Sequence, residues 1–121
     1  GVTYSLKDCL NVLGEIGVQP AQMLATGGGG RSPLWRQMLA DVFGCPVCTT
    51  QSKEGPALGV AILAGVGVGM YPSVQEACDR MIHIGLEQKP IAENRPAYAA
   101  CYDQYRQLYP ALKDAFKRLA K

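Results

Sequence analysis

The feature that most constrains this chain is a run of four glycines, residues 27–30, between a short apolar segment and a strong helix start. The preceding residues 23–26, Met-Leu-Ala-Thr, have the length and composition of a buried parallel strand. After the glycines, Ser32 is a favourable N-cap and Pro33 occupies the first helical position. In open α/β sheets ligands bind beyond the carboxyl ends of the strands, where these glycines fall. The order predicts a strand, a tight glycine turn at a ligand-binding edge, and a helix.

The glycine run favours a ligand-binding loop over a flexible linker. Glycines let the backbone turn sharply and approach a ligand without an intervening side chain, and the helix start that follows offers unpaired N–H groups. Linkers seldom separate a buried strand from a capped helix by so few residues. The sequence has neither the Walker lysine pattern nor a G-x-G-x-x-G run with its acidic partner. These residues therefore predict a ligand loop without identifying the ligand.

Residues 4–50 have the pattern of half a doubly wound α/β layer. Apolar side chains recur at helical spacing across residues 4–16, and again from Ser32 until Gly44. Residues 45–50 are acceptable as a second short strand, in which Pro46 takes the first position. We expect the two strands to be parallel and the helix between them to be a right-handed crossover.

The second half of the sequence predicts helices only. Residues 56–67 are apolar all round, as expected of a helix buried on several sides, and Gly59 and Gly65 would admit a close neighbour. Ser73 caps a further helix whose apolar stripe reaches residue 82. Residues 85–96 carry prolines and mixed charges, so we expect a linker there.

The last segment predicts one long helix. Its large apolar and aromatic residues are spaced by alternating fours and threes, which places them on one helical stripe. We expect the helix to dock by this stripe as ordinary core packing and not by base stacking, and we expect Pro110 to kink or restart it. The stripe consists of Tyr98, Tyr102, Tyr105, Tyr109, Leu112, Phe116 and Leu119.

Composition bounds the chain to one domain or a piece of one. It has 121 residues, 48% of them hydrophobic, enough for a single core. A formal charge of +2 without an internal basic cluster favours neither nucleic acid nor a membrane as partner. No targeting segment is visible and the five cysteines suit reduced thiols, so we expect a cytoplasmic protein. Because the chain begins with Gly1 and not Met, we expect it to be truncated upstream.

Other candidate chemistry is weak. Cys45 and Cys48 have the C-x-x-C spacing, but zinc would need two further ligands and His83 lies far along the chain. We therefore expect no metal site, and for His83 a structural role. The aspartates lie within or beside helical patterns and are expected to be solvated or capping, so no catalytic residue is predicted. They are Asp8, Asp41, Asp79, Asp103 and Asp114.

Residues 27–41, GGGGRSPLWRQMLAD, followed by residues 54–61, EGPALGVA, resemble the adenosine motif and the next helix of FGGY carbohydrate kinases, most closely their xylulokinase branch. The resemblance is strong from Thr3 to about Ala64 and weak beyond. It implies an α/β fold that is a fragment of a ribonuclease H-like (actin-like ATPase) domain, with short parallel strands and several packed helices. The whole of residues 1–121 would be the C-terminal part of the nucleotide-binding domain.

The resemblance also implies a function. The complete enzyme would use ATP and Mg²⁺ to phosphorylate a ketopentose, D-xylulose, to its 5-phosphate; the alternatives are another polyol or sugar acid, or a non-kinase nucleotide-binding or interaction domain. Its sugar pocket, catalytic aspartate and first phosphate loops would precede Gly1, so this chain alone should be inactive and should associate with itself, as a homo-oligomer, or with its missing N-terminal part. The expected nucleotide contacts are Gly27, Gly28, Gly29 and Ser32, with Gly30, Arg31 and Gln37 as weaker candidates.

Overall fold

The computed structural model describes residues 1–51 and 55–120. Glu54, which belongs to the motif noted above, lies outside the described residues. None of the described helices combines the length and the apolarity that crossing a membrane requires. In chain order the elements are α1 (Val2–Glu15), β1 (Met23–Leu24), α2 (Gly27–Gly30), α3 (Pro33–Phe43), β2 (Val47–Thr50), α4 (Gly55–Gly67), α5 (Val74–Met81), β3 (Ile84–Gln88), the 3₁₀ turn η1 (Ala92–Asn94) and α6 (Arg95–Leu119).

Three strands form one sheet in the order β1-β2-β3. β1 and β2 are parallel, with Met23 opposite Val47, which confirms the predicted strand pair. The predicted linker is wrong at its start, because β3 pairs antiparallel with β2, placing Gln88 opposite Val47. An isolated edge strand of mixed polarity gives little local signal, since its stability depends on the backbone partners that β2 supplies.

The core lies where α3 covers the parallel strands. Leu39, Ala40 and Val47 are buried there, and partly buried apolar side chains such as Phe43 pack around them. The predicted ends of this helix are confirmed: the backbone N–H of Trp35 donates to Ser32 Oγ, and α3 stops at a left-handed glycine. β1 is less buried than predicted, because one of its two side chains remains exposed.

The helix α1 packs beside α3, and the Trp35 indole N–H donates to Thr3 Oγ1 at 3.1 Å. The first half of α6 packs across this pair. The Tyr4 ring lies 5.6 Å from the Tyr102 ring and 5.5 Å from the Tyr105 ring, measured between centroids. The predicted docking of the tyrosine stripe is therefore confirmed at its start.

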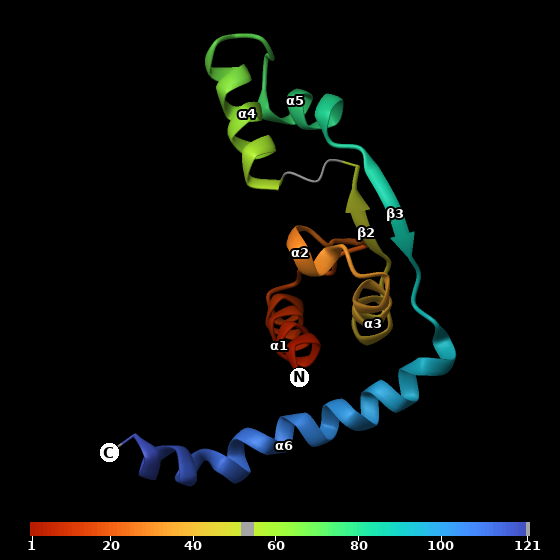
Figure 1. The fold of residues 1–121 in the computed structure, drawn as a ribbon, viewed down its shortest axis with the longest axis vertical. Coiled ribbons are helices and arrows are strands. Elements are labelled where there is room, and N and C mark those ends of the chain that lie inside the picture. The colour runs from red at the N-terminus through yellow and green to blue at the C-terminus, as the bar shows by residue number, and fades with distance from the viewer. Residues whose placement is uncertain (52–54, 121) are drawn as a thin grey trace.

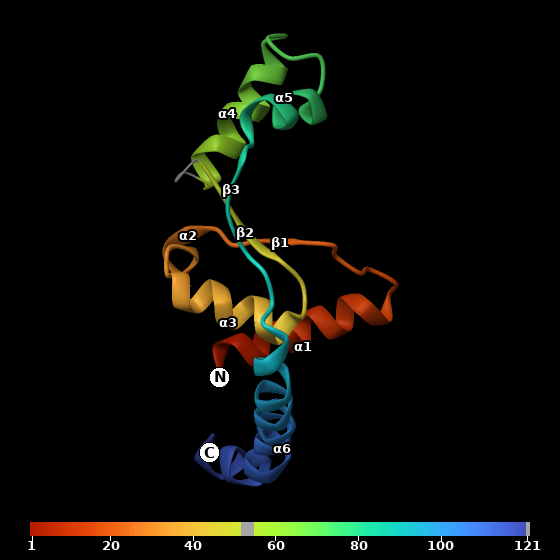
Figure 2. The same ribbon diagram turned by 90° about the vertical axis from the view of Figure 1, so that its right-hand side faces the viewer.

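The second half of α6 differs from the prediction. The helix continues through Pro110, so of the two predicted effects of this proline a restart is wrong, whereas the bend of the C-terminal part of α6 in Figure 2 agrees with a kink. This part leads away from the rest of the molecule (Figures 1 and 2). Its apolar residues remain exposed: Tyr109 has 64% of its surface accessible. The periodicity identifies the apolar stripe correctly, but it cannot say whether this chain covers it.

At the opposite end, α4 and α5 form a helical hairpin beyond the sheet (Figures 1 and 2). The cap that Ser73 provides for α5 is confirmed, because Ser73 Oγ accepts from the Glu76 backbone N–H. The prediction that α4 is buried on several sides is wrong within the described structure: only Ile62 and Gly65 of α4 are buried. Gly65 does admit a close neighbour, the Tyr71 ring.

Candidate functional site

A cavity of about 590 Å³ opens between α2, the neighbouring ends of β2 and β3, and the start of α4. We refer to it as the glycine cavity. Its volume lies within the range of about 300–1,000 Å³ typical of small-molecule sites. It adjoins the carboxyl ends of the parallel strands, as ligand sites of open α/β sheets do. It is lined by Ala25, Thr26, Gly27, Gly30, Arg31, Arg36, Thr49, Thr50, Gln51, Gly55, Gly85 and Leu86.

The glycine run is a single helical turn, α2, and not the simple tight turn predicted. Gly27 has a φ of +74°, a left-handed conformation that other residues rarely adopt. A Cβ atom on Gly30 would lie 2.8 Å from the carbonyl oxygen of Ala25, so this glycine allows α2 to pack on the end of β1. A Cβ on Gly29 would overlap the Trp35 ring.

Gly28 differs from its neighbours. Its φ is not left-handed, and a Cβ atom built on it has no other atom within 4 Å. Neither packing nor backbone conformation of the described residues requires a glycine at this position. A side chain there would meet only what approaches α2 from outside.

The predicted site residues divide into two groups. Gly27, Gly30 and Arg31 line the glycine cavity, whereas Gly28, Gly29, Ser32 and Gln37 are not among its lining residues. Ser32 caps α3 through its hydroxyl. All remain predictions as nucleotide contacts.

Gln37, one of the weaker candidates, has a structural environment. Its side-chain amide donates to Asp41 Oδ1 at 2.9 Å and to the Lys89 carbonyl oxygen at 2.8 Å. It thereby joins α3 to the segment after β3. Its amide nitrogen is engaged by these two acceptors.

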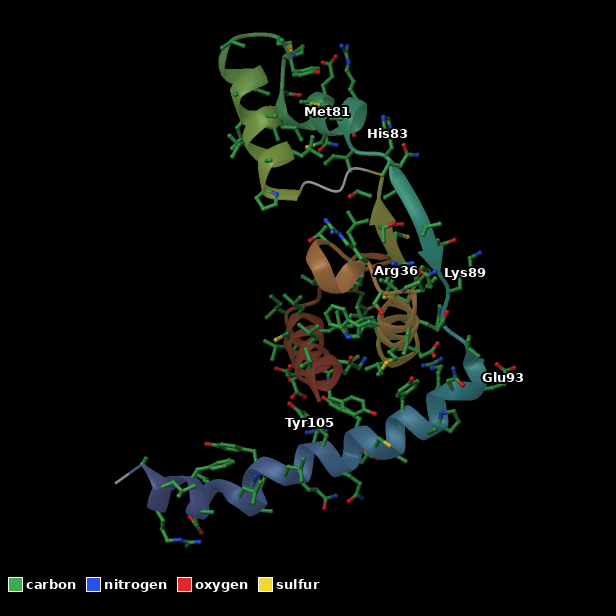
Figure 3. All side chains as sticks on the ribbon, viewed as in Figure 1. Arg36, Met81, His83, Lys89, Glu93 and Tyr105 are labelled. Atoms are coloured by element: carbon green, nitrogen blue, oxygen red, sulfur yellow. The ribbon has the colours of Figure 1, made fainter. Side chains whose placement is uncertain are left out.

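The predicted set of site residues does not contain Arg36, although Arg36 lines the cavity and is only 3% exposed. Its Nε donates to Gln88 Oε1 at 2.6 Å, and its Nη1 donates to the Gly30 carbonyl oxygen at 2.7 Å. Figure 3 shows Arg36 between α3 and the end of β3. The sequence position of Arg36 does indicate burial, since Arg36 shares a helical face with the buried Leu39 and Ala40.

β2 and β3 form a close-packed wall of the cavity. The Leu86 backbone N–H donates to Thr49 Oγ1 at 3.1 Å. A Cβ atom on Gly85 would lie 3.0 Å from the same oxygen, so a larger residue would push the two strands apart. The wall facing the glycine turn is therefore fixed by a side-chain hydrogen bond as well as by the strand pairing.

Asp41 contradicts the expectation of a solvated or capping carboxylate, because it is only 3% exposed. Its oxygens accept from the Ile91 backbone N–H at 2.7 Å, from Asn94 Nδ2 at 2.8 Å and from Gln37. Burial by itself raises the pKa of Asp41, but these hydrogen bonds outweigh it and hold the pKa below its ordinary value. Asp41 thus joins α3 to η1 and the start of α6.

The C-x-x-C pair lies at the start of β2 as free thiols, with Cys48 buried and Cys45 half-buried. Burial raises the pKa of Cys45, although Lys7 acts in the opposite direction, so this thiol is not activated. Across residues 1–51 and 55–120, no three His, Cys, Asp or Glu side chains are grouped so that they could hold a metal ion. His83 is exposed, and its carbonyl oxygen accepts from the Gln51 backbone N–H.

The sequence of this chain is similar to those of known carbohydrate kinases. Residues 1–68 match the family model described as "FGGY family of carbohydrate kinases, C-terminal domain". The chain is 32% identical to "Xylulose kinase" of Bacillus subtilis over 94% of its own length and 23% of the relative's. It is 41% identical to "Autoinducer-2 kinase" of Salmonella typhimurium over 77% of its length and 18% of the relative's.

The solved structure of ligand-bound xylulose kinase from Lactobacillus acidophilus has the same fold over 98% of this chain and 24% of that one, with a TM-score of 0.88 and 22% identity. The mixed α/β structure is thus a fragment of the fold of such kinases. The chain spans about a quarter of the length of the proteins that it matches.

Proposed function

Because the chain belongs to the FGGY family of carbohydrate kinases, as part of the C-terminal domain, we propose that it is the adenosine-binding part of an ATP-dependent sugar kinase. The complete enzyme would transfer the γ-phosphoryl group of ATP to a ketopentose, D-xylulose, giving xylulose 5-phosphate. Residues 1–121 would contribute one side of the active-site cleft, and the rest of the kinase would contribute the other. We place this enzyme in the cytoplasm and propose that it is a homo-oligomer.

The observation that carries the proposal is the glycine cavity. Gly27 and Gly30, at the two ends of the glycine turn, border it with backbone that bears no side chains, at the sheet edge where ligands bind. A purine ring or ribose could therefore approach the peptide planes of α2 closely. Arg31 lines the same cavity and adds a positive charge, which suits the anionic end of a nucleotide.

Mg²⁺ belongs to the proposed reaction, and such sites usually hold it with one or two carboxylates together with the substrate phosphates and not with an all-protein cage. Its charge would neutralise the phosphates during transfer. We propose that any protein ligands for it come from outside this chain, together with the base that activates the sugar hydroxyl. In this chain the buried carboxylate Asp41 is engaged by three hydrogen bonds and does not line the glycine cavity.

This division of labour makes the chain alone inactive. Phosphoryl transfer depends on holding both substrates in line and on neutralising charge in the transition state. The adenosine-binding part supplies neither the sugar pocket nor the phosphate clamp. Association with the N-terminal part of the kinase would complete the cleft.

A second sugar substrate is favoured by one observation, the 41% identity to an autoinducer-2 kinase. This identity is higher than that to the xylulose kinase, although it covers less of the chain. The alternative is therefore a kinase for another polyol or sugar derivative with the same nucleotide site. Parallel assays of the complete kinase with xylulose and with other sugars decide between them.

Substitution of Gly28 by valine in the complete kinase tests the nucleotide site. No described atom lies near the added side chain, so the melting temperature should stay within a few degrees of wild type. If the adenosine packs on α2, the valine should raise the Kd for ATP by at least about tenfold, about 1.4 kcal/mol. Calorimetric titration with ATP and with sugar measures both affinities. Unchanged ATP binding in the folded variant would remove this turn from the nucleotide site.

A further inference from the structure

We infer that Arg36 is a positioning residue for the nucleotide, which fixes the width of the glycine cavity by tying the glycine turn to β3. The inference rests on the proposed nucleotide site. It concerns a side chain that we do not expect to touch the nucleotide. Arg36 would act through the two oxygens that accept its hydrogen bonds, the Gly30 carbonyl and the Gln88 side-chain amide.

The contacts of Arg36 close a ring of interactions that passes through residues lining the cavity, namely Ala25, Gly30 and Arg36 itself. Gly30 packs directly on the Ala25 backbone, and the Ala25 N–H donates to the Cys48 carbonyl oxygen at 2.8 Å. From β2 the ring passes to β3, because Val47 pairs with Gln88. Arg36 then connects Gln88 back to Gly30. Without Arg36, the ring opens between the glycine turn and β3.

The ring matters because the cavity lies between the two parts that Arg36 joins. One side of the cavity is the glycine turn, represented by Gly27 and Gly30. The opposite side includes Gly85 and Leu86 of β3. A nucleotide that packs on the turn needs these two sides at a fixed separation, since a bound geometry that shifts by a fraction of an ångström loses contacts on one side.

The chemistry of Arg36 also favours a role beyond packing. Its side chain is almost fully buried, yet no ion pair among the described residues includes it. A buried guanidinium without a carboxylate is costly, and an apolar side chain of similar length would fill the same space more favourably. A guanidinium offers a rigid fork that holds two separate acceptors at once. That property matches the two hydrogen bonds observed.

Lysine cannot reproduce this arrangement. Its single ammonium carries the same charge but lies at the end of a flexible chain, without the planar fork. We expect it to keep a hydrogen bond to only one acceptor, because all its donors lie on one nitrogen atom, whereas Arg36 uses two separate nitrogens, Nε and Nη1. A lysine at this position therefore separates the geometry of Arg36 from its charge.

The test uses the complete kinase and compares Arg36→Met, Arg36→Lys and Gln88→Leu with wild type. Steady-state kinetics give KM for ATP and for sugar, and kcat; calorimetry gives the Kd of ATP. We expect Arg36→Met to raise both the KM and the Kd for ATP by about tenfold, because it loses both hydrogen bonds. Arg36→Lys should remain close to that value, and Gln88→Leu should show a smaller increase of about threefold. The KM for sugar should stay at the wild-type value in all three.

The matched control is Asp41→Asn, which weakens another buried polar contact of α3 at a residue that does not line the cavity. It should lower the melting temperature but leave the KM for ATP unchanged. Equal increases in the KM for ATP in Asp41→Asn and Arg36→Met would overturn the inference, because both would then reflect general destabilisation. Recovery of wild-type ATP affinity by Arg36→Lys would also overturn it, since charge alone would then suffice.

The remaining outcomes distinguish a failure of the inference from a failure of the proposed nucleotide site on which it rests. If Arg36→Met does not fold, Gln88→Leu decides alone, since Gln88 is a half-buried residue of an edge strand. If wild type binds ATP and Gly28→Val weakens it while Gln88→Leu and Arg36→Met match wild type, the inference is wrong and the nucleotide site stands. If wild type does not bind ATP, the nucleotide site itself fails.

Discussion

The sheet region of this molecule and its two helical extensions differ in how far their apolar surface is buried. The extensions are the α4–α5 hairpin and the second half of α6. In the sheet region, α3 and the strands bury apolar side chains against one another, although α1 and its C-cap residue beside them leave Val12 and Ile16 exposed. In the extensions, α4 and the second half of α6 leave large apolar residues such as Leu63 and Phe116 exposed. The core between α3 and the strands therefore contains its own packing partners. α4 is apolar all round and the second half of α6 has an apolar stripe, so partners for both are expected from other chain segments or copies.

This difference bears on function. The glycine cavity borders the sheet region and also the start of α4. The part of the site that the chain orders by itself is therefore the glycine turn and its wall. The apolar faces of α4 would be covered only in the proposed complete kinase, since the relatives are about four times longer than this chain.

The test with the largest expected effect shortens one core side chain of the sheet region. Leu39 is 5% exposed and lies in the cluster beneath α3. Replacing it with alanine in this chain should lower the free energy of unfolding by about 2–5 kcal/mol, because the lost burial is compounded by a cavity. Urea denaturation followed by circular dichroism measures the change. A loss below about 0.5 kcal/mol, the size of an ordinary surface effect, would show that the sheet region has no fixed core.

A second test concerns the buried carboxylate of Asp41, and its expected effect is smaller. Asp41→Asn should lower the free energy of unfolding at pH 7 by about 1–3 kcal/mol, since its charge-assisted hydrogen bonds are weakened. The lowered pKa of Asp41 sets the sign of the pH dependence. Its contribution is complete above the ordinary pKa of about 3.9 and is lost as the pH falls through the folded-state pKa.

The measurement for Asp41 is therefore a pair of urea denaturation series, wild type and Asp41→Asn, from pH 7 down to about pH 3. The gap between the two proteins should narrow on the acid side. A gap that stays constant across this range would mean that the carboxylate is not held in its ionised form by the Ile91 and Asn94 contacts.

The parts of this fold that could be predicted from the sequence are those with local causes. The N-cap at Ser32, the left-handed end of α3 at Gly44 and the cap at Ser73 each depend on residues within one turn. The parallel pair β1 and β2 follows from the strand, helix and strand order. For the caps and the helix end, the physical signal and the structure that it specifies lie in the same short segment. For the strand pair, they lie in consecutive elements of the chain.

The parts that could not be predicted depend on distant contacts. β3 needs β2 as a partner, and the buried state of Asp41 needs the Ile91 N–H, 50 residues away. Arg36 likewise acquires its role from Gln88, 52 residues away. A charged residue in a helix is exposed on average, so composition argues against burial unless the partner is known. The candidate site was predicted from its glycines, whereas Arg36 beside it was not.

The smallest expected effect comes from the extensions, and it depends on the protein in which it is measured. Leu63 of α4 is 63% exposed in this chain. Replacing it with alanine here should change the free energy of unfolding by no more than about 0.5 kcal/mol, as at other exposed positions. In the complete kinase the same substitution should cost about 2 kcal/mol or more, if the remainder of the protein covers α4.

The comparison between the two proteins isolates the covering partner, because the substitution and its local helix are identical in both. Helix propensity cannot produce the difference, since leucine and alanine are both good helix formers. Leu39→Ala serves as the matched control, because its partners are all within this chain and its cost should be similar in both proteins. Equal small effects of Leu63→Ala in both would mean that α4 stays exposed in the kinase. The exposed face of α4 would then need another explanation, such as contact with a second copy.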